Sequence, residues 1–381
     1  MTDWRIPLSD IDLGDDEISS VEEVLKSRWL TMGRVTQDFE SAFASYTGAK
    51  HALAVTNATA ALHMACMAID LKPGDEVIVP SLTFVASANS IRYTGAIPVF
   101  ADITSETNFN ISPDAVEALI TERTRAIMPV HFGGYACDMP CILELAHKYN
   151  LKVIEDAAHA AGSWLESRHL GTWGDIGCFS FFSNKNMTTG EGGMVITNDD
   201  TLFEKLRLLR SHGMTTLTWD RHKGHAWSYD VVDLGYNYRI DEIRAALGTV
   251  QLSKLERNNE RRRHLTQIYR DLLQELPQIS VPFSDHPGIT SAHIMPILLP
   301  LGSNRVEFME NMKSQGIQTS IHYPPIHKFT SYQEFGGEML SQRLLLTENV
   351  SNREVTLPLY PAMDEENVLT IVQGISNSLP Q

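Results

Sequence analysis

The sequence predicts an α/β protein with a mostly parallel central sheet and a smaller α+β domain at the C-terminus. Up to about residue 200, short apolar runs alternate with helical stretches, which is the pattern of a sheet buried on both faces. Near residue 240 the alternation changes, and the 381-residue length favours two domains. We therefore expect an N-terminal arm and large domain over residues 1–245 and a small domain over 246–381.

The elements of the large domain follow from the periodicity of its apolar residues. Two amphipathic helices come first, at Asp16–Lys26 and Gln37–Tyr46, and Thr36 is placed to cap the second. The predicted strands are Glu76–Val79, Ile97–Phe100, Ala126–Val130, Lys152–Ile154, Ile176–Phe181 and Gly193–Thr197. The helices predicted between them are Ala60–Ile69, Val85–Tyr93, Pro113–Ile120 and Met139–Tyr149.

A different succession of elements predicts the small domain. It begins with a long, highly charged helix over Asp241–Leu273, with a break near Arg257–Arg261. The elements predicted after it are strand Ala292–Leu299, helix Arg305–Gln315, strand Ile317–His322 and helix Glu365–Ser376.

Charge and hydropathy exclude several classes of protein. The 31 Lys and Arg residues against 47 Asp and Glu give a net charge of −16, which repels nucleic acid and anionic membranes. No apolar run reaches the roughly eighteen residues of a membrane span. The N-terminus also lacks a basic and then apolar signal stretch, so we expect a cytoplasmic protein.

The cysteine pattern argues against a metal site. Cys66, Cys137, Cys141 and Cys178 are the four cysteines, and three lie in apolar stretches where buried free thiols are expected. Cys137 and Cys141 form a single C-x3-C without a second ligand pair, and no H-E-x-x-H motif occurs, so no metal is expected. No strand is followed by G-x-G-x-x-G, which disfavours a nicotinamide enzyme.

Small and hydroxyl residues precede a predicted helix in the segment Val55–Leu62. The free N–H groups and positive dipole of a helix N-terminus make an anion site. An ordinary N-cap at Asn57 or Thr59 explains the same pattern.

Two acids, Glu155 and Asp156, end a predicted buried strand. Ligands of open α/β sheets bind at the carboxyl ends of strands, where an acid can neutralise a cationic heterocycle. A helix-capping aspartate is the alternative.

Lys185 follows an aromatic strand and precedes the glycine-rich turn Gly190–Gly193. Burial favours the neutral form of a lysine, and a neutral amine can form a Schiff base with an aldehyde. A surface lysine beside a loop is the alternative interpretation.

Taken in order, these segments resemble the DegT/DnrJ/EryC1/StrS family of aminotransferases that modify nucleotide-linked keto sugars. The resemblance runs from Pro7 to about Leu369 and also includes Pro80–Phe84 and Gly235–Arg239. It implies the aspartate-aminotransferase fold (PLP fold type I), pyridoxal 5'-phosphate (PLP) as cofactor, L-glutamate as amino donor and a homodimer with shared active sites. The residues from Phe181 to Lys185 look most like the GDP-perosamine synthase branch, which aminates a 4-keto-6-deoxy sugar.

The resemblance also implies roles for single residues. Lys185 matches the lysine that binds the cofactor and moves the proton, and Asp156 matches the partner of its pyridine nitrogen. The other cofactor-binding positions are Ala58, Thr59 and Ser180 at the phosphate, Phe84 and His159 at the ring, and Asn237 from the other subunit. The positions expected on the substrate side are Thr31, Glu191, Arg239, His322 and His327.

Several alternatives stay open at this point. His322 and His327 can serve a proline-rich turn instead of a sugar. The run Arg261–Arg263 is interpreted as a solvated helix face, or else as a site for a nucleotide diphosphate. The amine acceptor can be a non-sugar ketone such as a cyclitol. A PLP-dependent sugar dehydratase is disfavoured because such relatives replace the lysine by histidine, and the acidic charge disfavours a regulatory DNA-binding protein.

Overall fold

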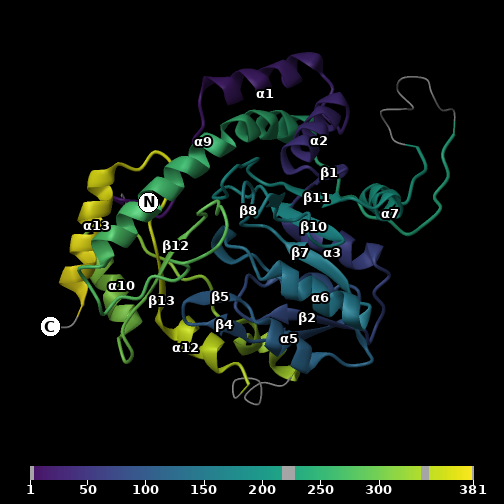
Figure 1. Cartoon of the computed structure of the whole chain (residues 1–381). Coiled ribbons are helices and arrows are strands. Elements are labelled where there is room, and N and C mark those ends of the chain that lie inside the picture. Colours follow the sequence, from purple (N-terminus) through teal and green to yellow (C-terminus); the bar gives the residue numbers. More distant parts are fainter. Residues whose placement is uncertain (1–3, 217–227, 336–342, 380–381) are drawn as a thin grey trace.

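A seven-stranded sheet forms the centre of the protein (Figure 1), whose computed structural model describes residues 4–216, 228–335 and 343–379. The strand order is β1-β11-β10-β7-β6-β2-β3, and only β11 runs antiparallel to its two neighbours. The prediction of a mostly parallel sheet is thus confirmed. The strands are β1 (His51–Val55), β2 (Glu76–Pro80), β3 (Ile97–Ala101), β6 (Thr124–Ile127), β7 (Lys152–Asp156), β10 (Ile176–Ser180) and β11 (Gly193–Thr197).

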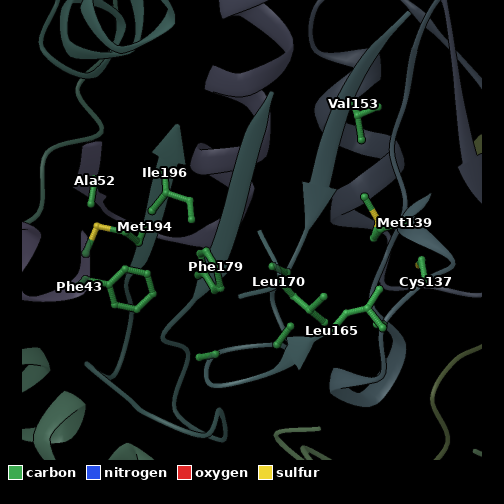
Figure 2. Packing of buried hydrophobic residues seen from close by; sticks show 14 of the residues in the cluster. Phe43, Ala52, Cys137, Met139, Val153, Leu165, Leu170, Phe179, Met194 and Ile196 are labelled. Atoms are coloured by element: carbon green, nitrogen blue, oxygen red, sulfur yellow. The ribbon is translucent and has the colours of Figure 1, made fainter. Parts of the chain in front are cut away.

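Both faces of this sheet are covered by helices. The side chains of β11 alternate between two cores, with Met194 and Ile196 in one and Val195 in the other. Figure 2 shows the first core, where Phe43 and Met139 come from helices and pack with strand residues such as Phe179. The helices of the large domain are α1 (Asp15–Ser27), α2 (Arg34–Thr47), α3 (Ala58–Ala68), α4 (Ala86–Arg92), α5 (Pro113–Leu119), α6 (Met139–Tyr149) and α7 (Asp200–Arg210).

The C-terminal part has a core of its own around the antiparallel pair β12 (Met295–Leu298) and β13 (Glu354–Leu357). Its helices are α10 (Arg305–Ser314), α12 (Leu345–Arg353) and α13 (Glu365–Ser378), and the short pairs β4 (Ile103–Ser105) with β5 (Asn108–Ile111) and β8 (Trp164–Leu165) with β9 (Arg168–His169) lie in connections of the large domain.

Helix α9 (Glu242–Leu273) links the two parts, because Ala245 and Leu255 lie in the large core whereas Leu265 and Tyr269 lie in the C-terminal core (Figure 1). The predicted division at residues 245 and 246 falls within the first turn of α9, and it stays a prediction.

Three details of the predicted elements are wrong. The helix does not break near Arg257–Arg261: α9 continues through this segment, and Arg257 and Arg261 form ion pairs with Asp12 and Glu365. Thr36 does not cap α2, which begins at Arg34, and the carboxylate that accepts the N–H groups of Gly33, Val35 and Thr36 is that of Glu242 from α9.

The third wrong detail is the strand expected over Ile317–His322. This segment makes only single bridges, between Ile317 and Ile6 and between Ser320 and Thr356. The expectation of free cysteines is confirmed, and three of the four are buried. Within the described ranges, no helix is long and apolar enough to cross a membrane.

Candidate active site

A cavity of about 400 Å³ opens at the carboxyl ends of β7 and β10 and at the N-terminus of α3. This is the edge where open parallel sheets bind ligands. Nine of the residues predicted from sequence line it, namely Ala58, Thr59, Phe84, Asp156, His159, Ser180, Lys185, Glu191 and His322.

One end of the cavity is suited to an anion. The side chain of Asn57 caps α3 by accepting a hydrogen bond from the N–H of Ala60 at 2.8 Å, so the capping interpretation is correct. The first N–H groups of the helix, at Ala58 and Thr59, have no acceptor within the helix and carry the positive end of its dipole. The cap at Asn57 therefore leaves donors free at this helix end for an anion.

At this end of the cavity, the backbone of β11 lies very close to the start of α3. A Cβ at Gly193 would lie 2.7 Å from the carbonyl carbon of Asn57 and 2.8 Å from the nitrogen of Ala58. Only glycine lets β11 approach the start of α3 so closely. Ser180 lies beside them, and its hydroxyl oxygen accepts the N–H of Phe182 at 3.3 Å, which leaves its hydrogen for a ligand.

Asp156 supplies a carboxylate deeper in the cavity. Its Oδ2 accepts a hydrogen bond from Ser87 at 2.7 Å, and its Oδ1 accepts one from the N–H of Ala158 at 3.2 Å. Burial raises the pKa of this carboxyl, while the two hydrogen bonds and the charge of Lys185 act in the opposite direction. The adjacent Glu155 points elsewhere and serves the structure, because it accepts from Gly171 and Gly174.

Lys185 presents an amine to the same cavity. Its backbone N–H donates to the carbonyl of Phe182 at 2.9 Å and holds the turn after β10. Within the described ranges, its Nζ has no hydrogen-bond or ion-pair partner. Burial lowers the pKa of Lys185 to about 8, although the charge of Asp156 raises it in part. A substantial fraction of the amine is therefore neutral and nucleophilic near neutral pH.

His159 forms a side wall of the cavity with a defined tautomer. Its Nδ1 accepts the N–H of Gly133 at 3.2 Å, and its Nε2 lies 3.0 Å from the hydroxyl of Tyr323. Burial and the charge of Lys185 hold its pKa well below the usual value, so the ring is neutral. Its one hydrogen must be on Nε2 and is donated to Tyr323, which leaves the phenol hydrogen for a ligand.

The cavity also contains residues that sequence reasoning did not assign. Thr83 and Tyr323 lie within the Pro80–Phe84 and Ser320–His327 segments, where a local signal existed. His293 had no such signal, and its Nδ1 lies 2.7 Å from the side-chain oxygen of Asn186.

Four predicted residues do not line the cavity. Thr31 and Asn237 are exposed, and Arg239 is partly buried and bridges to Val55. His327 is buried and bonds Ser81 at 2.7 Å and Glu348 at 2.8 Å.

The interpretation of Arg261–Arg263 as a solvated face is wrong for Arg262. Its side chain is only 2% exposed and donates to the carbonyls of Leu359 at 2.8 Å and His293 at 3.3 Å. No member of the run lines the cavity.

The groups around the cavity fit PLP. The start of α3 and Ser180 offer donors to a phosphate, Asp156 offers a carboxylate to a protonated pyridine nitrogen, and Lys185 offers an unpaired amine to an aldehyde. Within the described ranges, no group of three or more His, Cys, Asp or Glu side chains is placed to hold a metal ion.

Comparisons with known proteins agree with this chemistry. Residues 11–376 match the model of the DegT/DnrJ/EryC1/StrS aminotransferase family. The spore coat polysaccharide biosynthesis protein SpsC of Bacillus subtilis is 40% identical over 98% of this chain and 95% of its own.

Solved structures superimpose over nearly the whole chain. PseC of Helicobacter pylori, an aminotransferase involved in the biosynthesis of pseudoaminic acid, has a TM-score of 0.91 at 31% identity, with 98% of both chains covered. The PLP-form of the putative sugar aminotransferase Spr1654 from Streptococcus pneumoniae has a TM-score of 0.89 at 28% identity and covers 98% of this chain and 100% of its own. The fold is therefore PLP fold type I, and the chain belongs to the DegT/DnrJ/EryC1/StrS family of PLP-dependent aminotransferases.

Proposed function

We propose that this enzyme transfers the amino group of L-glutamate to a nucleotide-linked keto sugar, a 4-keto-6-deoxyhexose, in the biosynthesis of amino sugars for a cell-surface polysaccharide such as lipopolysaccharide O-antigen. The observation that carries the proposal is the position of Lys185 and Asp156 in one cavity, with an amine that has no partner among the described residues. A sugar acceptor is supported by the relatives, since PseC is described as an aminotransferase of pseudoaminic acid biosynthesis, Spr1654 as a putative sugar aminotransferase and SpsC as a spore coat polysaccharide biosynthesis protein.

Asp156 and Lys185 have separate roles in the proposed reaction. PLP, when bound, supplies an electron sink for the negative charge that develops at the substrate carbon. Asp156 stabilises positive charge on the ring nitrogen through its buried carboxylate. Lys185, with a pKa lowered to about 8, takes a proton from the amino-bearing carbon of the donor substrate. It later gives a proton to the carbon of the acceptor substrate that receives the amino group.

The rim of the cavity offers both apolar and polar surface to a substrate. Phe84 is 57% exposed and lies 6.0 Å from the ring of Tyr323, so an apolar face is available beside the polar cavity floor. Glu191 and His322 supply polar groups that suit sugar hydroxyls.

We also propose that the enzyme works as a homodimer with shared sites. Asn237 is exposed and does not reach its own cavity, which supports a role at the cavity of a second copy. We assign Thr31 and Arg239 to the substrate side of that shared site by the resemblance to the family, since neither lines the cavity of its own chain. His327 serves that side indirectly, through its hydrogen bond to Ser81 in the loop that leads to Phe84.

The experiment supplies the purified enzyme with PLP, L-glutamate and a panel of GDP-, dTDP- and UDP-linked 4-keto-6-deoxyhexoses. Mass spectrometry should detect one sugar in which an amino group replaces the keto oxygen. Lys185→Ala should form product at a rate lower by about 10³-fold or more, whereas Lys313→Ala, which alters an exposed lysine paired with Glu310, should match the wild type.

Two negative results have different meanings. If glutamate is converted to 2-oxoglutarate but no keto sugar is aminated, the assigned acceptor is wrong. If glutamate is not converted at all, the assigned donor is wrong.

A further inference from the structure

Three buried side chains form a hydrogen-bonded series that begins at the cavity. His322 lines the cavity, and its Nδ1 lies 2.8 Å from the hydroxyl oxygen of Thr356. That oxygen lies 2.5 Å from Oε1 of Glu354, whose Oε2 accepts the backbone N–H of His322 at 2.8 Å. The exposed fractions of the three residues are 9%, 1% and 1%, so water does not compete for these contacts.

We propose that Glu354 is a positioning residue that acts through Thr356 to decide which ring nitrogen of His322 carries the hydrogen. Thr356 and Glu354 lie on β13, behind His322, and neither lines the cavity. The tautomer of His322 affects the substrate because Nδ1 is hydrogen-bonded to Thr356, which leaves Nε2 as the ring nitrogen available to a ligand. No partner of Nε2 occurs within the described ranges.

The two states follow from the hydrogen-bonding capacity of each group. When Glu354 is ionised it can only accept, so the hydroxyl of Thr356 donates to it. The oxygen of Thr356 then accepts from Nδ1–H of His322, and Nε2 presents a lone pair to the cavity. When Glu354 is protonated it donates to Thr356, the hydroxyl turns to Nδ1, and His322 presents Nε2–H.

The proton balance of the exchange is simple. Ionisation removes one proton from the series, and that proton leaves from Nε2 of His322 into the cavity. The proton of the Glu354 carboxyl passes to the oxygen of Thr356, whose own hydrogen passes to Nδ1. Thr356 and the imidazole therefore each carry one hydrogen before and after the exchange.

The groups around Glu354 determine its pKa and therefore the pH at which the tautomer of His322 changes. Burial raises the pKa of Glu354 to about 8, against the opposing effects of Thr356, the N–H of His322 and the charge of Arg305. Arg305 itself donates to the backbone carbonyl of Glu354 at 3.3 Å, and the phenol of Tyr323 also lies near enough to be affected by the charge of the carboxyl.

His322 stays neutral throughout. Burial and the charge of Lys185 lower its pKa to about 3, and its other titratable neighbours, His159 and His293, are themselves neutral through burial. Only the tautomer of His322 changes when Glu354 titrates.

The consequence concerns substrates, and here the inference rests on the proposed function. Nε2–H suits a carboxylate of the amino donor or the oxygen of a keto group, because both accept hydrogen bonds. A bare Nε2 suits a donor such as a sugar hydroxyl. The ionisation of Glu354 therefore decides whether His322 donates a hydrogen bond to the substrate or accepts one.

The test is a nuclear magnetic resonance titration of the PLP-bound enzyme labelled with ¹⁵N-histidine, because a ring nitrogen that carries hydrogen has a different shift from a bare one. The signals of His322 are those missing from His322→Gln. In the wild type, the hydrogen should move from Nε2 to Nδ1 as the pH rises through about 8.

Three variants separate positioning from general structure. In Glu354→Gln the amide oxygen accepts the N–H of His322 and the amide nitrogen donates to Thr356, so His322 should keep Nε2–H at every pH. Thr356→Val should abolish the exchange with the same side-chain volume, and Thr356→Ser should restore it.

A His322 that keeps one tautomer from pH 6 to pH 10 in the wild type, or that still exchanges in Glu354→Gln, overturns the proposal. The titration uses no substrate, so its outcome is independent of the proposed function. An enzyme that exchanges the tautomer but transfers no amino group contradicts the proposed function alone.

Discussion

Ser87 donates a hydrogen bond from its Oγ to Oδ2 of Asp156 over 2.7 Å, and both side chains are buried. Ser87 lies on α4, a helix that follows the loop carrying Phe84. The contact therefore fixes the orientation of the carboxylate from a helix that is separate from the strand carrying Asp156. It also favours the ionised carboxylate, which burial alone would disfavour.

We expect Ser87→Ala to raise the pKa of Asp156 further, because a hydrogen bond to the charged form is lost. A hydrogen bond to a charged group contributes about 1.5–3 kcal/mol, so the acidic limb of the activity profile should move about one pH unit upward. Steady-state rates from pH 5 to pH 9 measure the shift. Ser90→Ala is the matched control, since Ser90 is buried on the same helix but bonds the carbonyl of Ser87 and the thiol of Cys66, and not Asp156. An unchanged profile in Ser87→Ala would contradict the assigned role.

Lys185 should react with aldehydes in a pH-dependent way. The neutral amine is the nucleophile, and the pKa of Lys185 is lowered to about 8. The rate at which cofactor-free protein binds PLP covalently should therefore rise with pH through about 8 and then level off. Stopped-flow absorbance measures it. Lys185→Ala should show no covalent binding and an amino-transfer rate lower by about 10³-fold or more. A rate that still rises steeply above pH 10 would mean that the lysine is not perturbed.

Gly193→Ala should weaken cofactor binding. The added Cβ would lie 2.7 Å from backbone of Asn57, so β11 and the start of α3 must separate. Overpacking of this kind costs about 1–3 kcal/mol, which corresponds to a cofactor Kd higher by about tenfold or more. Fluorescence titration with PLP measures the Kd. Gly14→Ala is the control, because the nearest atoms to its Cβ are 3.9 Å away.

The buried carboxyl of Glu354 should make stability depend on pH. Its pKa is raised from 4.5 to about 8 in the folded protein, so between these values the folded state binds more protons than the unfolded state. The contribution of this residue to stability is therefore full below pH 4.5 and is lost as the pH rises toward 8. Denaturant unfolding of wild type and Glu354→Gln at several pH values measures the difference. A difference that does not change with pH would show that Glu354 is ionised throughout.

Arg262 should contribute more to stability than its charged neighbours on α9. Arg262→Met removes the donors of two buried carbonyls, and each unsatisfied group costs about 1–3 kcal/mol. Arg257→Met should cost less than about 1 kcal/mol, because the Arg257 side chain is 68% exposed and its ion pair with Asp12 is open to solvent on that side. Thermal unfolding of the two variants compares them, and equal losses would contradict the buried role of Arg262.

Local patterns in the sequence were sufficient to predict much of the central sheet and of the candidate site. Short apolar runs predicted six strands of the central sheet, β2, β3, β6, β7, β10 and β11, because a strand buried on both faces needs a continuous apolar segment. The edge strand β1 and the short strands β4, β5, β8 and β9 were not predicted. The motifs around Asp156 and Lys185 each stand at a strand end, and parallel strands present their carboxyl ends at one edge of the sheet. Nine predicted site residues therefore meet in one cavity.

Other features depend on contacts between residues that are far apart in the chain. Glu242 supplies the N-terminal acceptor of α2, Arg262 is buried by Leu359 and His293, and His322 is held by Glu354 and Thr356. No periodicity or local motif predicts such partners. The donors and acceptors are brought together only when the sheet and the C-terminal core pack. The sequence by itself determined the fold class and the cofactor chemistry, whereas the tertiary structure alone decided the protonation partners of His159 and His322, since these depend on which buried groups face each other.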